Sequence, residues 1–148
     1  MRAKIFLESL CKQGVPWNVP LEGGNLVRWQ TWLSKLERLD RFTVSGCIKP
    51  VDFSEILTCQ VHQCSDVSEV GYGVASYVHP LNVDNQIHCA LLMSLLTVAP
   101  LKTMTIIRLE LSAATLAIRL HHLVLKLLSY GLNAIFYWTD SMAVFRHL

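Results

Sequence analysis

Three acidic residues stand beside apolar sequence, where a solvent-facing charge is not expected. Asp66 follows a β-type segment, Glu110 lies in the apolar run that begins at Ile106, and Asp140 ends an aromatic run. Three converging carboxylates repel one another unless a cation neutralises them, and hard oxygen ligands select Mg²⁺ or Mn²⁺ over zinc. Two such ions can stabilise the attacking and leaving oxygens of a phosphodiester. The acids therefore indicate metal-dependent phosphodiester hydrolysis.

The same acids also have ordinary structural interpretations. Asp140 would cap a helix, Asp66 would stabilise a turn, and Glu110 would form an ion pair with Arg108 or Arg119. Caps and turns are the commonest uses of aspartate. Spacing alone therefore favours the structural interpretation, and the chemical one needs support from the elements that would position the acids.

The sequence after Pro50 begins with a pattern typical of β-strands. Segment 57–65 alternates partly, segment 71–78 is rich in β-formers, and segment 86–98 is a long apolar run. Glycine, proline, asparagine and aspartate separate these segments. The pattern predicts a three-stranded meander.

A long helix and a fourth strand should follow the meander. Thr103 or Thr105 would cap a helix whose apolar periodicity covers 109–128, and Gly131 suits the position after its end. The aromatic run 134–138 predicts the strand. The order β-β-β-α-β describes a mixed α/β layer, and a further helix would open after this strand with Asp140 or Ser141 as its cap.

This arrangement would bring the three acids together. The helix positions three, four and seven residues after Glu110 are all alanine, so this face could lie close against a sheet. If Asp66 and Asp140 end neighbouring parallel strands, their carboxylates emerge at the same sheet edge, where open α/β sheets usually place their sites.

The first 50 residues form a basic leader with a different pattern. They carry eight Lys or Arg and four Asp or Glu, whereas residues 51–148 carry five and seven. Two short amphipathic helices are predicted, with apolar residues at helical spacing: Ile5, Leu7, Leu10 and Cys11 in the first, and Leu26, Trp29, Trp32, Leu33 and Leu36 in the second. We therefore expect a helical segment over 1–50 and an α/β domain over 51–148.

Composition narrows the class of protein. With 148 residues, 52% hydrophobic and 16% charged, the chain is one ordinary domain with a leader and is not disordered. Its net charge of +2 is too small to argue for nucleic-acid or membrane binding.

The five cysteines, an odd number without a secretory leader, predict reduced thiols and an intracellular location, cytoplasmic or nuclear. The longest uncharged run falls short of a membrane span. A zinc site at Cys59, His62, Cys64 and His79 has awkward spacing, and ordinary strand packing explains these residues better.

Four motifs in a fixed order carry a family resemblance. They are SDVSEVGYG at 65–73, VAPLK at 98–102, RLELSAA at 108–114 and YWTDS at 137–141. Together they resemble the ribonuclease H domain of BEL/Pao-type retrotransposon polyproteins. The leader resembles the segment that links reverse transcriptase to that domain, notably at Trp17, 28–32 and Leu36.

The resemblance implies a ribonuclease H-like fold that uses two Mg²⁺ (or Mn²⁺) ions to cut the RNA strand of an RNA/DNA hybrid. By motif, Asp66, Glu110 and Asp140 match three of its metal-binding carboxylates. It also implies the hybrid as a partner, and the parent reverse transcriptase as a second one.

The chain departs from the family pattern in several places. Leu95 and Thr97 stand where the family usually has Lys and Arg, and Ile107 stands where it usually has Pro. The family fold continues to a further strand, a closing helix and a fourth acid, whereas this chain ends at Leu148. We therefore expect a C-terminally truncated domain with impaired activity and with uncovered apolar area that promotes aggregation or self-association. The alternative is a non-catalytic remnant that acts as a nucleic-acid or protein interaction module.

Overall fold

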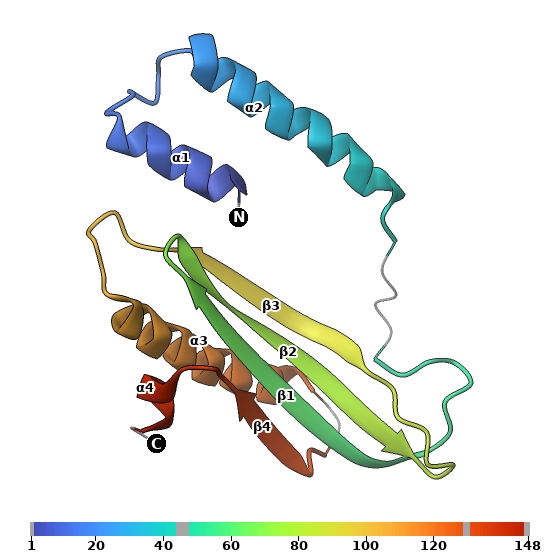
Figure 1. Ribbon diagram of the computed structural model, residues 1–148. Coiled ribbons are helices and arrows are strands. Elements are labelled where there is room, and N and C mark those ends of the chain that lie inside the picture. Colours follow the sequence, from blue (N-terminus) through green and yellow to red (C-terminus); the bar gives the residue numbers. More distant parts are fainter. Residues whose placement is uncertain (1, 44–47, 129–130, 147–148) are drawn as a thin grey trace. The chain divides into compact units, whose positions relative to one another are not determined.

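The computed structural model describes residues 2–43, 48–128 and 131–146 (Figure 1). The chain forms two compact units, residues 1–45 and 46–148, and each is described by itself. The domain boundary after Pro50 stays a prediction. Ile48 packs against the hydrophobic core of the second unit.

The first unit contains helices α1 (Arg2–Lys12) and α2 (Gly23–Leu36) and the short 3₁₀-helix η1 (Glu37–Arg41). Both predicted leader helices are confirmed. Phe6 and Leu10 are its buried apolar residues, and the ring of Phe6 stacks on Trp29 with centroids 5.7 Å apart. The guanidinium of Arg28 lies 5.4 Å from the centre of the Phe6 ring, a cation–π distance. Aromatic contacts therefore join α1 to α2.

The second unit is built on a four-stranded mixed sheet. Its strands are β1 (Ile56–Ser68), β2 (Gly71–Asn82), β3 (Ala90–Val98) and β4 (Ala134–Trp138), in the order β3-β2-β1-β4. β2 pairs antiparallel with both β1 and β3, and β4 pairs parallel with β1. The predicted meander and the β-β-β-α-β order are confirmed. The parallel pairing of β1 with β4 is the arrangement that a shared sheet edge for Asp66 and Asp140 requires.

Strands β1 and β2 are longer than the sequence pattern predicts. Their pairing continues to Ser68 opposite Gly71, so only two residues connect them. Pro80 and Asn82, expected in a loop, belong to β2. The Asn82 side chain forms the following turn, because its Oδ1 accepts hydrogen bonds from the backbone N–H groups of Asp84 and Gln86.

Helices α3 (Ile106–Leu127) and α4 (Met142–Phe145) complete the second unit. The hydroxyl of Thr105 accepts a bond from a backbone N–H of the first turn of α3, which confirms the predicted cap. The prediction for the helix end is wrong. Leu128 already has an extended backbone and packs against the core, so the helix ends there and Gly131 is not its C′ residue. The other residue predicted at this end, Tyr130, lies outside the described residues.

The core lies between one face of the sheet and α3 (Figure 1). It contains alternate residues of the two central strands and a stripe of α3: Cys59, Val61, Val74, Val78, Ala117, Leu120 and Val124. Alternation along β1 and β2 places one side chain in two against the helix. None of the helices in the described ranges is long and apolar enough to cross a membrane.

Candidate active site at the β1–β4 edge

Asp66 lies near the end of β1, and Asp140 lies two residues after the end of the neighbouring strand β4. The parallel register pairs Gln60 with Ala134 and runs to Cys64 with Trp138. Two residues beyond this last pair are Asp66, still inside β1, and Asp140, in the loop after β4. The structure therefore brings both acids to the same edge of the sheet, as expected for the carboxyl ends of parallel strands.

Asp66 itself lies inside β1 and not after it, which corrects the predicted strand end. Its side chain is exposed, and its Oδ1 accepts a hydrogen bond of 2.8 Å from the backbone N–H of Val67. Alternation along β1 puts Asp66 on the face shared by His62 and Cys64, whereas Gln63 is buried on the α3 face. Asp66 therefore occupies a strand position and not a turn. Its side chain leaves the backbone on the face of the sheet away from α3.

Glu110 is joined to the loop that carries Asp140. It lies one turn into α3 and is half-buried. Ala113 and Ala117, on the same face of the helix, are buried against the sheet, as predicted. The Oε2 of Glu110 accepts a hydrogen bond of 2.7 Å from the Ser141 hydroxyl. The partner of Glu110 is thus the residue after Asp140, not a helix arginine.

Ser141 makes a compact set of hydrogen bonds at this edge. Its Oγ accepts a bond of 3.2 Å from the N–H of Val144, and its own N–H donates 3.1 Å to the hydroxyl oxygen of Thr139. Ser141, not Asp140, therefore caps α4. The contact with Glu110 spans 31 positions in the sequence, and nothing in the local pattern signalled it.

The side chains of these three acids are of the type that binds divalent cations, and they lie at one edge of the sheet. Carboxylate oxygens are hard ligands that Mg²⁺ and Mn²⁺ prefer. As the side chains stand, no three His, Cys, Asp or Glu residues within the described ranges are close enough to hold a metal ion together. Asp66 and Asp140 are both exposed. Their rotamers would have to turn toward Glu110 for the three to share an ion.

The open face of β1 and β4 carries a stack of aromatic rings that the sequence did not reveal. His62 lies 4.3 Å from His79, 5.0 Å from Phe136 and 5.9 Å from Trp138, measured between ring centroids. Burial, and secondarily the nearby His79, lower the pKa of His62. Cys59 is buried on the opposite face of β1, so the four residues considered for zinc do not gather.

A hollow of about 210 Å³ lies beside the same helix. It is lined by Tyr72 of β2 and by Ser112, Thr115, Leu116 and Arg119 of α3. The hydroxyls of Ser112 and Thr115 each donate to a backbone carbonyl one turn earlier in the helix. Arg119 therefore brings the positive charge of this hollow, while the two hydroxyls offer acceptor oxygens.

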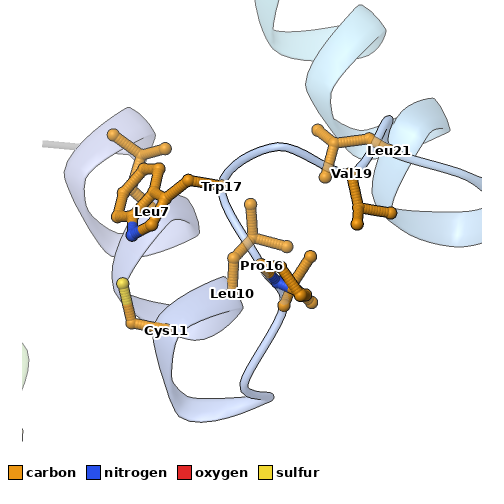
Figure 2. A pocket seen from close by; sticks show the side chains of 8 residues that line it. Leu7, Leu10, Cys11, Pro16, Trp17, Val19 and Leu21 are labelled. Carbon is orange, nitrogen blue, oxygen red and sulfur yellow. The ribbon is translucent and has the colours of Figure 1, made fainter.

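The first unit has an apolar hollow of its own, of about 150 Å³ (Figure 2). Its lining comes from the end of α1 and the segment that follows: Leu7, Leu10, Cys11, Val15, Pro16, Trp17, Val19 and Leu21. None of these side chains is charged, so this hollow offers no groups for the chemistry predicted at the sheet edge.

The order of the strands, the helix across one face and the acids at the β1–β4 edge define a ribonuclease H-like α/β domain. Residues 1–141 match the family model described as "Pao retrotransposon-like RNaseH-like domain". The chain belongs to this family, which confirms the resemblance and the expected fold. Searches of curated proteins and of solved structures found no significant match. The family implies nuclease function, nucleic-acid binding and the use of a divalent metal.

Proposed function

We propose that this chain retains its family's chemistry, cleavage of the RNA strand of RNA/DNA hybrids with Mg²⁺ or Mn²⁺, at an impaired rate, and that Asp66, Glu110 and Asp140 bind the cation. The observation that carries the proposal is the hydrogen bond from Ser141 to Glu110. It ties the α3 acid to the loop of Asp140, which follows the strand paired with β1, and Asp66 lies in β1 two residues beyond the last pair of this register. The family supports this assignment of chemistry to the acids.

The chain's own residues have separate tasks in this proposal. Glu110 presents a carboxylate from a helix that is fixed by its buried face. Asp66 adds an exposed carboxylate from β1, and Asp140 adds one from the loop after β4. A bound divalent cation would supply charge stabilisation at the phosphodiester. Arg119 and the hollow beside it offer a positive contact for the phosphate backbone, and the ribose 2′-hydroxyl is the group that distinguishes RNA from DNA.

The setting of this activity is part of the proposal. The family name supports an origin in a retrotransposon polyprotein. In that setting residues 1–50 would connect the domain to reverse transcriptase, and the hybrid made by that enzyme would be the substrate. An intracellular location, cytoplasmic or nuclear, follows from this substrate.

A cleavage assay tests the proposal directly. The full chain is incubated with a hybrid labelled on its RNA strand, in Mg²⁺ or Mn²⁺, beside Asp66→Asn, Glu110→Gln and Asp140→Asn. Glu69→Gln is the matched control, because Glu69 is an exposed acid three residues from Asp66. We expect slow, cation-dependent cleavage that Glu69→Gln retains and the other three variants lose. Cleavage that survives in all three would refute the assignment of the acids.

A second candidate function is hybrid binding without cleavage. Its supporting observation is the orientation of Asp66, which begins on the face away from α3 and hydrogen-bonds to the backbone of the next residue. In this case the chain retards a labelled hybrid in a binding assay, in a salt-dependent way, and yields no product at any cation concentration. Arg119→Ala should weaken that binding. Failure to bind and to cleave would exclude both candidates.

A further inference from the structure

We infer that Ser141 is a positioning residue for Glu110: its hydroxyl holds one carboxylate oxygen and leaves the other for a cation. The inference rests on the proposed function, because the orientation of Glu110 matters to the reaction only if Glu110 is a cation ligand. Nothing in the family match assigns a role to this serine.

The hydrogen bonds of Ser141 fix its hydroxyl in one direction. A serine hydroxyl has a single hydrogen to donate, and Ser141 donates it to Glu110 Oε2 at 2.7 Å. The same oxygen accepts from the N–H of Val144 at 3.2 Å. Ser141 is only 4% exposed, so water does not compete freely for the hydroxyl. The donor is therefore held toward the carboxylate.

This contact restricts a side chain that would otherwise be mobile. Glutamate has three rotatable side-chain bonds, and fixing them costs entropy when an ion binds. A carboxylate already hydrogen-bonded from a buried donor has lost that freedom before the ion arrives. Outer partners of metal ligands act in this way, and their loss typically lowers metal affinity by about 10–100-fold.

Binding of Mn²⁺ alone to the full chain tests the inference through four proteins. They are the unchanged chain, Ser141→Ala, Glu110→Ala and the double variant, with dissociation constants from paramagnetic relaxation of water. We expect Ser141→Ala to weaken binding by about 10–100-fold and to add no further loss once Glu110 is gone. Ser141→Thr should restore affinity, since threonine keeps the hydroxyl. Ser34→Ala removes a helix hydroxyl of the first unit, which donates to the carbonyl of Thr31, and should leave affinity unchanged.

The outcomes separate positioning from simple loss of structure. Ser141→Ala also removes the cap of α4, and a purely structural effect would lower affinity equally with and without Glu110. That result, or an unchanged affinity in Ser141→Ala, overturns the inference while leaving the proposed function standing. If the unchanged chain binds no Mn²⁺ through the three acids, the proposed function fails and this inference fails with it.

Discussion

Trp138 donates a hydrogen bond from its indole Nε1 to Nδ1 of His62, at 2.9 Å, between the parallel strands β4 and β1. An indole nitrogen can only donate, so His62 must accept at Nδ1. A protonated imidazole carries hydrogens on both nitrogens and cannot accept there. The bond therefore requires the neutral form of His62, whose remaining N–H at Nε2 is buried without a partner.

This relationship predicts a loss of stability in mild acid. Burial, and then His79, lower the pKa of His62 from its ordinary 6.5. Below pH 6.5 the unfolded chain takes up a proton that the folded chain resists. Stability is thus fully present above pH 6.5 and falls as the pH drops toward the lowered pKa. The charged or titratable groups of β1 and β2 that share the face of His62 are Cys64, Asp66, Tyr77 and His79.

Thermal midpoints measured between pH 8 and pH 5 check this expectation. His62→Gln removes the titrating group, so its midpoint should fall less over this range than that of the unchanged chain. His121 contributes in the same direction, because burial and then His122 lower its pKa. For that reason the variant should keep part of the dependence. Identical pH profiles for the two proteins would contradict the role given to His62.

The core of the second unit predicts contrasting effects for two leucines of α3. Leu120 is 1% exposed and belongs to the core cluster, whereas Leu123, three residues later, is 42% exposed. Leu120→Ala should lower the free energy of unfolding by about 2–5 kcal/mol, and Leu123→Ala should change it by no more than about 0.5 kcal/mol. Urea denaturation followed by circular dichroism measures both. Equal losses would mean that α3 does not pack by this face.

Gly73 should be required for the close pairing of β2 with β3. A Cβ atom at this position would lie 2.7 Å from Leu96 Cδ1 and 3.2 Å from the carbonyl oxygen of Leu95. The leucine side chain can turn away, but the carbonyl belongs to the backbone of β3. Gly73→Ala should therefore cost about 1–3 kcal/mol of stability.

Gly131 is the matched control for this substitution. A Cβ atom there would meet no atom within 4 Å, and its backbone φ is not in the left-handed region. Gly131→Ala should leave the free energy of unfolding unchanged, or raise it by about 0.4–1 kcal/mol by restricting the unfolded chain. Similar losses for the two alanine variants would remove the steric explanation for Gly73.

The sequence predicts the elements of this fold well where periodicity and capping act locally. The alternation of β1 and β2, the apolar stripe of α3 and the cap at Thr105 are all local signals, and the structure contains each of them. The end of α3 differs from the prediction: Leu128 leaves the helical conformation and packs, half-buried, against the core, and the local glycine signal does not indicate this tertiary contact.

The candidate site was predictable only in part, for a related reason. The three acids could be selected from their apolar neighbours and by motif, and their shared sheet edge follows from the parallel pairing of β1 and β4. The hydrogen bond from Ser141 to Glu110 and the stack around His62 join residues more than ten positions apart. Such contacts depend on how elements pack, so no local pattern could indicate them.

The proposed cation ligands predict where Mn²⁺ should act on the folded chain. Mn²⁺ broadens the nuclear resonance signals of nearby atoms, and weak binding at the β1–β4 edge should broaden those of Asp66, Glu110 and Asp140 first. Their carboxylates would share the ion, which offsets the repulsion that gathering them creates.

Acids elsewhere serve as internal controls: Asp40 lies in η1, and Asp84 follows β2, where it accepts a hydrogen bond from Ser54. A titration followed by heteronuclear spectra measures all of these signals in one sample. Adding Mg²⁺ in excess should reverse the broadening, because both ions prefer the same oxygen ligands. Broadening confined to Asp40 or Asp84 would place the ion away from the sheet edge and would exclude the three acids as its ligands.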